Sequence, residues 1–477
     1  MSDLKVAKPV SEGTPVDPDT RRAKYPGLRA YPQTPAWIGE KMKSIFAMVL
    51  FSFALIAQST RAATPTFSHD IAPIVYGNCV SCHRPGEVAP FSLFTCDDVK
   101  KRADQIADVT GDRYMPPWKP EPNFGHFIGE RRLTDEQIKL IADWAKGGAP
   151  EGDPAETPKL PTFPVGWSLG TPDKIVKMEI PFKLPADGHD QYRAFVLPLD
   201  ADEMKFVSAV EFHPDNRKIV HHALFFLDTN GAAAAKEKAS TDGNPGYAAF
   251  GGPGFTPTGG LGGWAPGAPP EQLPDGWSRL VRKGSDLVVQ VHFHPDGKPE
   301  AETFSMGIYY SKSTPQHIVA GGNAHSFKIN IPPGEKNYVV TGQYKVPVDI
   351  DLIGITPHAH LICREMKATA TEPGGQEVPL IWIKDWDFNW QGTYHYAEPV
   401  KLPANTLVHF TYTYDNSTDN IHNPNNPPKP IHYGEQTTDE MAFLFLEGAP
   451  QKQSDYAALI QGNRRQMLDA LTRFLNK

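Results

Sequence analysis

Cysteine is scarce in this chain, with four residues among 477. Two of them belong to one short motif, which leaves Cys96 and Cys363, so no disulfide framework is expected to hold the fold. No basic block stands out and the formal net charge is −8, which argues against nucleic acid as a partner. Beyond residue 62 no apolar run is long enough to cross a membrane, so we expect no stable membrane insertion of the mature protein.

Proline and glycine are abundant instead, with 47 and 40 residues. This composition disfavours long helices and favours short strands joined by turns. The length is too great for one ordinary core and predicts two to four domains. We therefore expect a multidomain protein that is mostly β-structure.

The N-terminal region has the composition of a leader followed by an export signal. Residues 1–41 are polar and proline-rich and predict a disordered or untranslated leader. Residues 42–62 combine a basic start, an apolar run from Ile45 to Ala57 and small residues at the end. That layout is typical of a secretory signal peptide, and an uncleaved membrane anchor is the alternative. The mature protein is therefore expected to be periplasmic or secreted.

Residues 66–150 carry the motif Cys79-Val80-Ser81-Cys82-His83. In a Cys-x-x-Cys-His motif the two thiols attach covalently to haem and the histidine binds its iron. A zinc site and a redox dithiol are the alternatives. Both are weaker, because no second Cys/His pair stands at zinc spacing and no βαβ pattern surrounds the motif.

The sixth iron ligand is expected to be a thioether or a second imidazole. Met115, in the stiff run Tyr114-Met115-Pro116-Pro117-Trp118, is the leading candidate, and His126 is its rival. Thr134 to Gln137 forms a capping box that predicts a helix ending near Gly147. The whole segment resembles a small class I cytochrome c, which implies a small all-α domain.

Residues 151–170 are proline-rich and charged and predict a linker. From residue 171 onward, short alternating or β-branched runs separated by turn residues predict two all-β sandwiches, at 171–322 and 323–450. The glycine- and proline-rich run from Gly251 to Gly276 predicts a long surface loop. An amphipathic pattern from Tyr456 to Leu475 predicts a C-terminal helix within 451–477.

The histidines of the two predicted sandwiches form a recurring pattern. His358 and His360 alternate in a strand-like run, so both side chains are expected on one face. His221 and His222 are adjacent, and joint metal binding by both would need a β-bulge or a twist of the strand. Alternation alone does not choose between His292 and His294, which share a face.

Met441 follows further along the chain. Imidazoles together with one thioether suit copper that cycles between Cu(I) and Cu(II), because sulfur stabilises the reduced ion. Zinc is the alternative metal, although it favours cysteine or carboxylate partners. The order of these residues along the chain favours copper.

Residues from about 171 to 450 resemble the copper type II, ascorbate-dependent monooxygenase family, which includes peptidylglycine α-hydroxylating and dopamine β-monooxygenases. The resemblance implies two jelly-roll-like domains, each with one copper ion, facing each other across a cleft. It also implies which residues bind each ion and which act in catalysis. The electron-supplying copper would be held by His221, His222 and His292, the oxygen-activating copper by His358, His360 and Met441, and Gln290 would assist catalysis.

The chain departs from the amidating members of that family at the substrate. Those members place an arginine two residues before the His-x-His to bind a carboxylate, where this chain has Thr356. They also carry polar residues two and four positions after the methionine, where this chain has Phe443 and Phe445. A small neutral or apolar organic substrate is therefore expected, with O2 as co-substrate and an external donor reducing the haem. The alternative is a non-catalytic copper-binding or electron-transfer protein.

Overall fold

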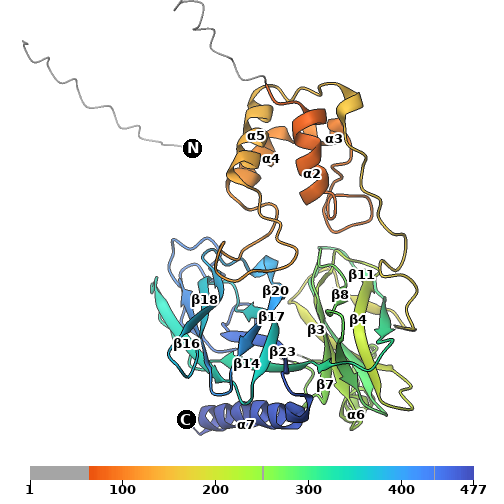
Figure 1. The fold of residues 1–477 in the computed structure, drawn as a ribbon, viewed down its shortest axis with the longest axis vertical. Helices are drawn as coiled ribbons and strands as arrows, with labels where there is room; N and C mark the ends of the chain where they lie inside the picture. The colour runs from red at the N-terminus through yellow and green to blue at the C-terminus, as the bar shows by residue number, and fades with distance from the viewer. Residues whose placement is uncertain (1–63, 250–251, 435, 477) are drawn as a thin grey trace, which may run out of the picture. The chain divides into compact units, whose positions relative to one another are not determined.

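The computed structural model describes residues 64–249, 252–434 and 436–476, which belong to one compact unit (Figure 1). The predicted leader at 1–41 and the predicted signal peptide at 42–62 lie outside the described residues. Within the described ranges, no helix is long and apolar enough to cross a membrane. Most of the regular structure is β-sheet, with a few short helices before it and one long helix after it.

A group of helices precedes the sheets (Figure 1). Its elements are η2 Phe67–Ile71, α2 Ala72–Asn78, α3 Cys96–Lys100, α4 Ala103–Gly111 and α5 Asp135–Lys146. The predicted capping box is present, since the Thr134 side chain accepts from the backbone N–H of Gln137 and the Gln137 side chain accepts in return. Phe67 and Trp144 are fully buried in a small core that these helices share.

The first β-sandwich consists of two sheets that enclose one core. One sheet has the order β1-β12-β4-β9-β13, with β8 beside β4, and the other has the order β6-β3-β10-β5-β7. The strands of the first sheet are β1 Lys174–Lys177, β4 Lys205–Pro214, β8 Glu271–Gln272, β9 Trp277–Val281, β12 Phe304–Tyr310 and β13 His317–Ile318. Those of the second are β3 Gln191–Pro198, β5 Val220–Asp228, β6 Tyr247–Ala248, β7 Gly259–Trp264 and β10 Asp286–Phe293. Helix α6, Ala232–Ala239, and the pair β2 Phe182–Leu184 with β11 Glu300–Glu302 complete this body.

The prediction of an irregular loop from Gly251 to Gly276 is wrong for part of its length. Gly259–Trp264 forms strand β7, which pairs with β5, and Glu271–Gln272 forms β8. The glycines permit this pairing, because a Cβ at Gly263 would lie 3.0 Å from the Ala223 carbonyl oxygen. A glycine-rich run can thus be an edge strand where another backbone approaches closely.

The second β-sandwich is built on one continuous eight-stranded sheet with the order β19-β18-β21-β16-β14-β23-β17-β20. Side chains from strands along this whole sheet meet in one core, so the sheet folds over on itself. Its strands are β14 Ala320–His325, β16 Tyr338–Lys345, β17 Ile350–His358, β18 Cys363–Thr371, β19 Glu377–Ile383, β20 Tyr394–Leu402, β21 Leu407–Tyr414 and β23 Phe443–Pro450. A short pair, β15 Asn330–Ile331 with β22 Ile431–His432, lies outside that sheet.

Both edge strands of that sheet are covered by residues 120–128, the closing loop, which connects α4 to α5. Pro120 bridges to Ile383 at the end of β19, and Phe127 bridges to Tyr396 in β20. The Ile128 N–H also donates to the carbonyl of His395 at 2.9 Å. Unpaired sheet edges invite pairing with other chains, and the closing loop removes that risk here.

A buried ion network joins the two sandwiches. The Arg279 guanidinium of β9 donates to the carboxylates of Glu271 in β8 and Glu447 in β23. Only 4% of the Arg279 side chain is exposed. Leu273 and Trp277 of the first sandwich share a small apolar core with residues of the second. The two bodies are therefore held together by both apolar and charged contacts.

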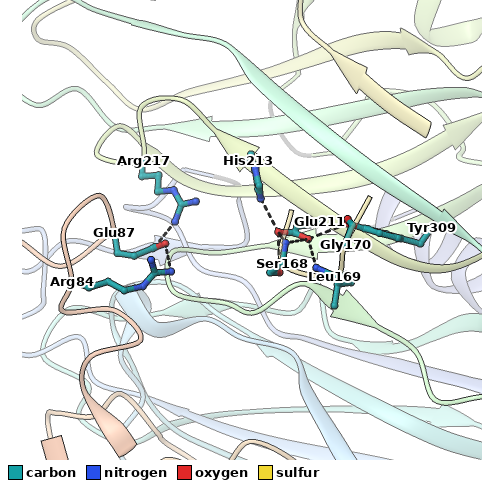
Figure 2. Close-up of polar contacts among 9 residues, drawn as sticks. All are labelled: Arg84, Glu87, Ser168, Leu169, Gly170, Glu211, His213, Arg217 and Tyr309. Carbon is teal, nitrogen blue, oxygen red and sulfur yellow. Dashed lines mark hydrogen bonds and ion pairs between the residues drawn. The ribbon is translucent and has the colours of Figure 1, made fainter. Parts of the chain in front are cut away.

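Two further predicted segments have defined places. The predicted linker is tied to the first sandwich, because the Glu211 carboxylate accepts from the backbone N–H of Ser168 at 2.8 Å and of Leu169 at 3.2 Å (Figure 2). The C-terminal helix is confirmed as α7, Tyr456–Leu475. It packs on the second sandwich through the fully buried Leu459, while Leu468 on the same helix is 51% exposed.

Candidate metal centre

The first histidine group consists of His221, His222 and His292. One ring nitrogen from each lies within 4.8 Å of one from each of the others. A β-bulge is present at the adjacent pair: His292 of β10 pairs with His222 of β5, but the next pair is Phe293 with Val220, which leaves His221 as the extra residue. The bulge turns two consecutive side chains toward one point, which a regular strand does not allow.

Asp190 distinguishes His292 from His294. Its two carboxylate oxygens accept from His292 Nε2 and from His294 Nδ1, each at 2.8 Å. His292 is 1% exposed, and its Nδ1 atom is buried with no hydrogen-bond partner in the described parts of the chain. His294 is 67% exposed, so the structure places His292, not His294, in the first histidine group. A buried imidazole nitrogen with no donor facing it fits a metal ligand, and a carboxylate on the other nitrogen fixes the ring tautomer.

The second histidine group consists of His358 and His360, at the end of β17 and just beyond it. Their ring centroids are 5.3 Å apart. His358 Nδ1 donates to the Gln391 side-chain oxygen at 2.6 Å, and His360 Nδ1 donates to the Asp439 carbonyl at 3.1 Å. Both Nδ1 atoms are thus occupied, which leaves the two Nε2 atoms as metal-binding positions.

Burial lowers the pKa values of His221, His222, His358 and His360. Burial lowers the pKa of His221 to about 4 and that of His360 to about 3, with smaller contributions from neighbouring imidazoles. The pKa of His222 is lowered well below its usual value, mainly by burial. Charges on neighbouring imidazoles contribute less, from His292, His221, His358 and His360. Neutral imidazole is the form that binds metal ions, so the lowered pKa values favour the metal-binding form of these four side chains at neutral pH.

Glu440 connects the second histidine group to Met441. Its fully buried carboxylate accepts from the backbone N–H of His360 and of Ile362, each at 2.8 Å, and from that of Met441 at 3.2 Å. The Tyr414 hydroxyl donates to the Met441 carbonyl at 2.6 Å. One carboxylate therefore fastens the turn after β17 and the start of the segment that leads into β23, although they lie far apart in sequence.

Gln290 lies on β10 two residues before His292 and is buried. Its side-chain nitrogen donates to the Ala249 carbonyl at 2.6 Å. In this structure Gln290 therefore supports the loop before residue 250.

The Cys-x-x-Cys-His motif forms a tight turn directly after α2. The His83 N–H donates to the Cys79 carbonyl at 2.9 Å. His83 Nδ1 donates to the Phe91 carbonyl at 3.2 Å, which leaves Nε2 for a ligand. Burial raises the pKa of the Cys79 thiol to about 12. Gly267 of the first sandwich approaches this turn, since a Cβ there would lie 3.1 Å from Cys82 Sγ.

Met115 lies in a pocket formed by α4, α5 and parts of the connection between them. The pocket is lined by Thr110, Arg113, Met115, Pro116, Trp118, Arg132, Leu133 and Ile138. Cys79, Cys82 and His83 do not line it. His126, the rival ligand, is exposed, and its backbone carbonyl accepts from the Ala397 N–H of β20 at 2.8 Å.

Glu87 links the Cys-x-x-Cys-His turn to the segment that leads into β5. Figure 2 shows its carboxylate between Arg84, whose Nη2 lies 2.7 Å away, and Arg217, which also donates to it. Glu87 follows His83 by four residues and Arg217 precedes His221 by four. The ion pair therefore holds the predicted haem attachment segment near the strand that carries the first histidine group.

A second cluster of metal-ligand types, Glu271, His395 and Glu447, lies between the sandwiches. Arg279 already donates to both of its carboxylates. The guanidinium thus supplies the positive charge that a metal ion would bring, and the cluster is a structural joint.

Sequence reasoning missed four residues of the centre: Asp190, Phe388, Gln391 and Glu440. Each acts on a histidine that is distant in sequence, and none belongs to a short motif. The aromatic run Trp386-Asp387-Phe388-Asn389-Trp390 close to a glutamine was the one local signal available.

Comparisons with known proteins add little. No family model and no curated protein matches the chain. Among solved structures, the infectious bursal disease virus Gx strain structure has a TM-score of 0.17 at 6% identity, covering 60% of this chain and 74% of that one. A structure of the T=1 Penaeus vannamei nodavirus has a TM-score of 0.15 at 11% identity, covering 57% and 99%. Scores this low carry no argument about fold or function.

Proposed function

We propose that the chain is an exported haem–copper monooxygenase that hydroxylates a C–H bond of a small neutral or apolar substrate. The observation that carries the proposal is the meeting of buried and half-buried imidazoles in two groups, within one compact unit that also contains a Cys-x-x-Cys-His turn. In the net reaction, the substrate, O2, two electrons and two protons give the hydroxylated product and water.

The first histidine group would hold one copper ion, and His358, His360 and Met441 would hold the other. Copper supplies one-electron chemistry between Cu(I) and Cu(II) and, where a thioether joins two imidazoles, activation of O2. The protein's own contribution is to fix the ligands. Asp190 accepts a hydrogen bond from one ring nitrogen of His292, and Gln391 accepts one from His358. The other ring nitrogen of each histidine would then be the one that binds copper.

Cys79, Cys82 and His83 would hold a c-type haem, with Met115 as the sixth ligand and an external donor reducing it. A c-type haem supplies a one-electron carrier, and a methionine ligand raises its potential relative to a second histidine. The ion pair of Glu87 and Arg217 joins the Cys-x-x-Cys-His turn to the segment that leads into β5, the strand with His221 and His222. This contact, with the resemblance to a class I cytochrome c, supports electron entry through the first histidine group.

The substrate face is proposed from strand register. On the second sandwich, Phe443 stands opposite His358, and Phe445 stands opposite Thr356. The two phenylalanine rings stack at 5.6 Å, and Phe445 is 43% exposed. Phe443 is buried, so Phe445 presents the exposed aromatic surface beside the second histidine group. That surface, with no arginine at the Thr356 position, favours a neutral or apolar substrate over a carboxylate.

The test is an anaerobic copper titration followed by O2 uptake against a panel of small organic compounds. We expect two copper ions per chain and substrate-dependent O2 consumption. Met441→Ala should abolish product formation while haem reoxidation persists, whereas His221→Ala should leave reduced haem accumulating. His294→Ala is the matched control, because His294 shares Asp190 but lies outside the group, and its copper count should stay at two.

Two outcomes would redirect the proposal. Two bound copper ions with fast haem reoxidation, but no O2 uptake with any compound, would identify an electron carrier. Haem reoxidation that is slowed by Met441→Ala and untouched by His221→Ala would reverse the roles of the two sites. Export to the periplasm or medium is part of the proposal and rests on the pattern at 42–62.

A further inference from the structure

One short segment contacts both histidine groups. This bridging segment, Asp385–Gln391, contains the 3-10 turn Phe388–Trp390 between β19 and β20. Its Trp386 side chain donates to the His360 carbonyl at 3.1 Å, and its Gln391 side chain accepts from His358. The bridging segment is thus fastened to both members of the second histidine group.

The position of Phe388 within the bridging segment is fixed by several bonds. The Gln391 side-chain nitrogen donates to the Phe388 carbonyl at 3.0 Å, while its oxygen holds His358. The Asp387 side chain caps the turn by accepting from the Asn389 N–H at 2.9 Å. At the start of the segment, Asp385 pairs with the buried Lys119 at 3.0 Å. The ring of Phe388 is therefore held by its own turn.

Phe388 lies against one histidine from each group. Its ring stacks on His221 with the centroids 5.3 Å apart and the planes at 17°, and it meets His360 edge-on at 5.9 Å. The same ring therefore contacts a member of the first histidine group and a member of the second. A half-buried aromatic ring thus lies between imidazoles that are near neighbours in space.

We infer that Phe388 is a positioning residue that keeps the two histidine groups apart as two separate metal sites. Five imidazoles gathered around one ring could otherwise share an ion or bridge a coupled pair of ions. The phenyl ring offers no ligand atom, occupies the space between His221 and His360, and fixes the plane of His221 by stacking. The inference rests on the proposed function, because it concerns the copper ions that the two groups would hold.

The first test uses the metal-free protein. Stacking on Phe388 should shift the ring-proton NMR signals of His221, and Phe388→Ala should remove that shift, whereas Phe388→Tyr should keep it. Phe124→Ala is the matched control, because Phe124 contacts Trp382 at 5.6 Å and neither histidine group. A His221 signal that does not move in Phe388→Ala overturns the inference, whether or not copper binds.

The second test adds Cu(II) and measures both stoichiometry and integrated EPR intensity. The unaltered chain, Phe388→Tyr and Phe124→Ala should bind two ions, each contributing its full signal. In Phe388→Ala we expect one ion per chain, or two ions whose coupling removes at least half of the signal. Two full, uncoupled signals in a folded Phe388→Ala protein overturn the inference and leave the proposed function standing. An unaltered chain that binds no copper refutes the proposed function, and the inference with it.

Discussion

Replacing Arg279 by methionine should destabilise the joint between the two sandwiches. The side chain is 4% exposed, and it donates to Glu271 and Glu447, whose side chains are 11% and 18% exposed. Methionine keeps much of the volume but leaves two largely buried carboxylates without their cation. Removing one partner of a buried ion pair costs about 3–5 kcal/mol, so we expect a loss of that size in the free energy of unfolding at pH 8.

The loss should depend on pH in a definite direction. Burial raises the pKa of Glu271 above its usual value, and Arg279 opposes that rise. Without Arg279 the folded-state pKa of Glu271 rises further above the unfolded value. A raised carboxyl pKa means that the folded state binds the proton more tightly, so stability falls as pH rises through the window between the two values. The destabilisation should therefore be smaller at pH 5 than at pH 8.

Urea unfolding of the full chain at both pH values measures this effect, with matched variants beside it. Arg113→Met breaks an exposed ion pair with Asp135, and such pairs contribute about 0–1 kcal/mol. Neutralising both carboxylates, by adding Glu271→Gln and Glu447→Gln to Arg279→Met, should recover much of the loss. The reasoning is refuted if Arg279→Met costs no more than Arg113→Met, or the same at pH 5 and pH 8.

Three further outcomes are expected. Asp190→Asn should weaken copper binding by the first histidine group by about 10–100-fold, since the carboxylate orients His292, and an unchanged titration would contradict this role. Glu440→Gln places an amide N–H₂ group opposite backbone N–H donors, so the free energy of unfolding should fall by about 1–3 kcal/mol. Thermal unfolding measures this, and an unchanged stability would show that Glu440 does not support the Met441 segment. Cys96 and Cys363 are free, so thiol counting on denatured, unreduced holoprotein should give two thiols, and none would refute their separation.

Much of this architecture was predictable because its signals are local. Alternating runs identified the sandwiches, the capping box identified α5, and the amphipathic tail identified α7. Joint metal binding by the adjacent pair His221-His222 would need a bulge or twist, and a bulge is present at this pair. These predictions depend on residues within a few positions of one another.

The residues that support the ligands could not be predicted in this way. Asp190 is 102 residues from His292, and Glu440 is 80 residues from His360. Strand alternation places His292 and His294 on one face but does not show which of them belongs to the first histidine group. That choice depends on the position of Asp190 and on the burial of each ring. Phe388 looked like an ordinary aromatic residue, because its role depends on where two distant strands bring their histidines.

The closing loop has a consequence for how the chain is made. Its partners at Ile383 and Tyr396 lie about 260 residues further along the chain, a large sequence separation of the kind that slows folding. At ribosomal speeds of about 5–20 residues per second, the loop would wait roughly 15–50 s for its strands to be synthesised. In a chain that ended before β19, the closing loop would lack its strand partners. In a chain without the closing loop, both edge strands of the sheet would be uncovered. The N-terminal helices and the second sandwich therefore complete their contacts only after both have been synthesised. Neither can be exchanged alone without losing these contacts.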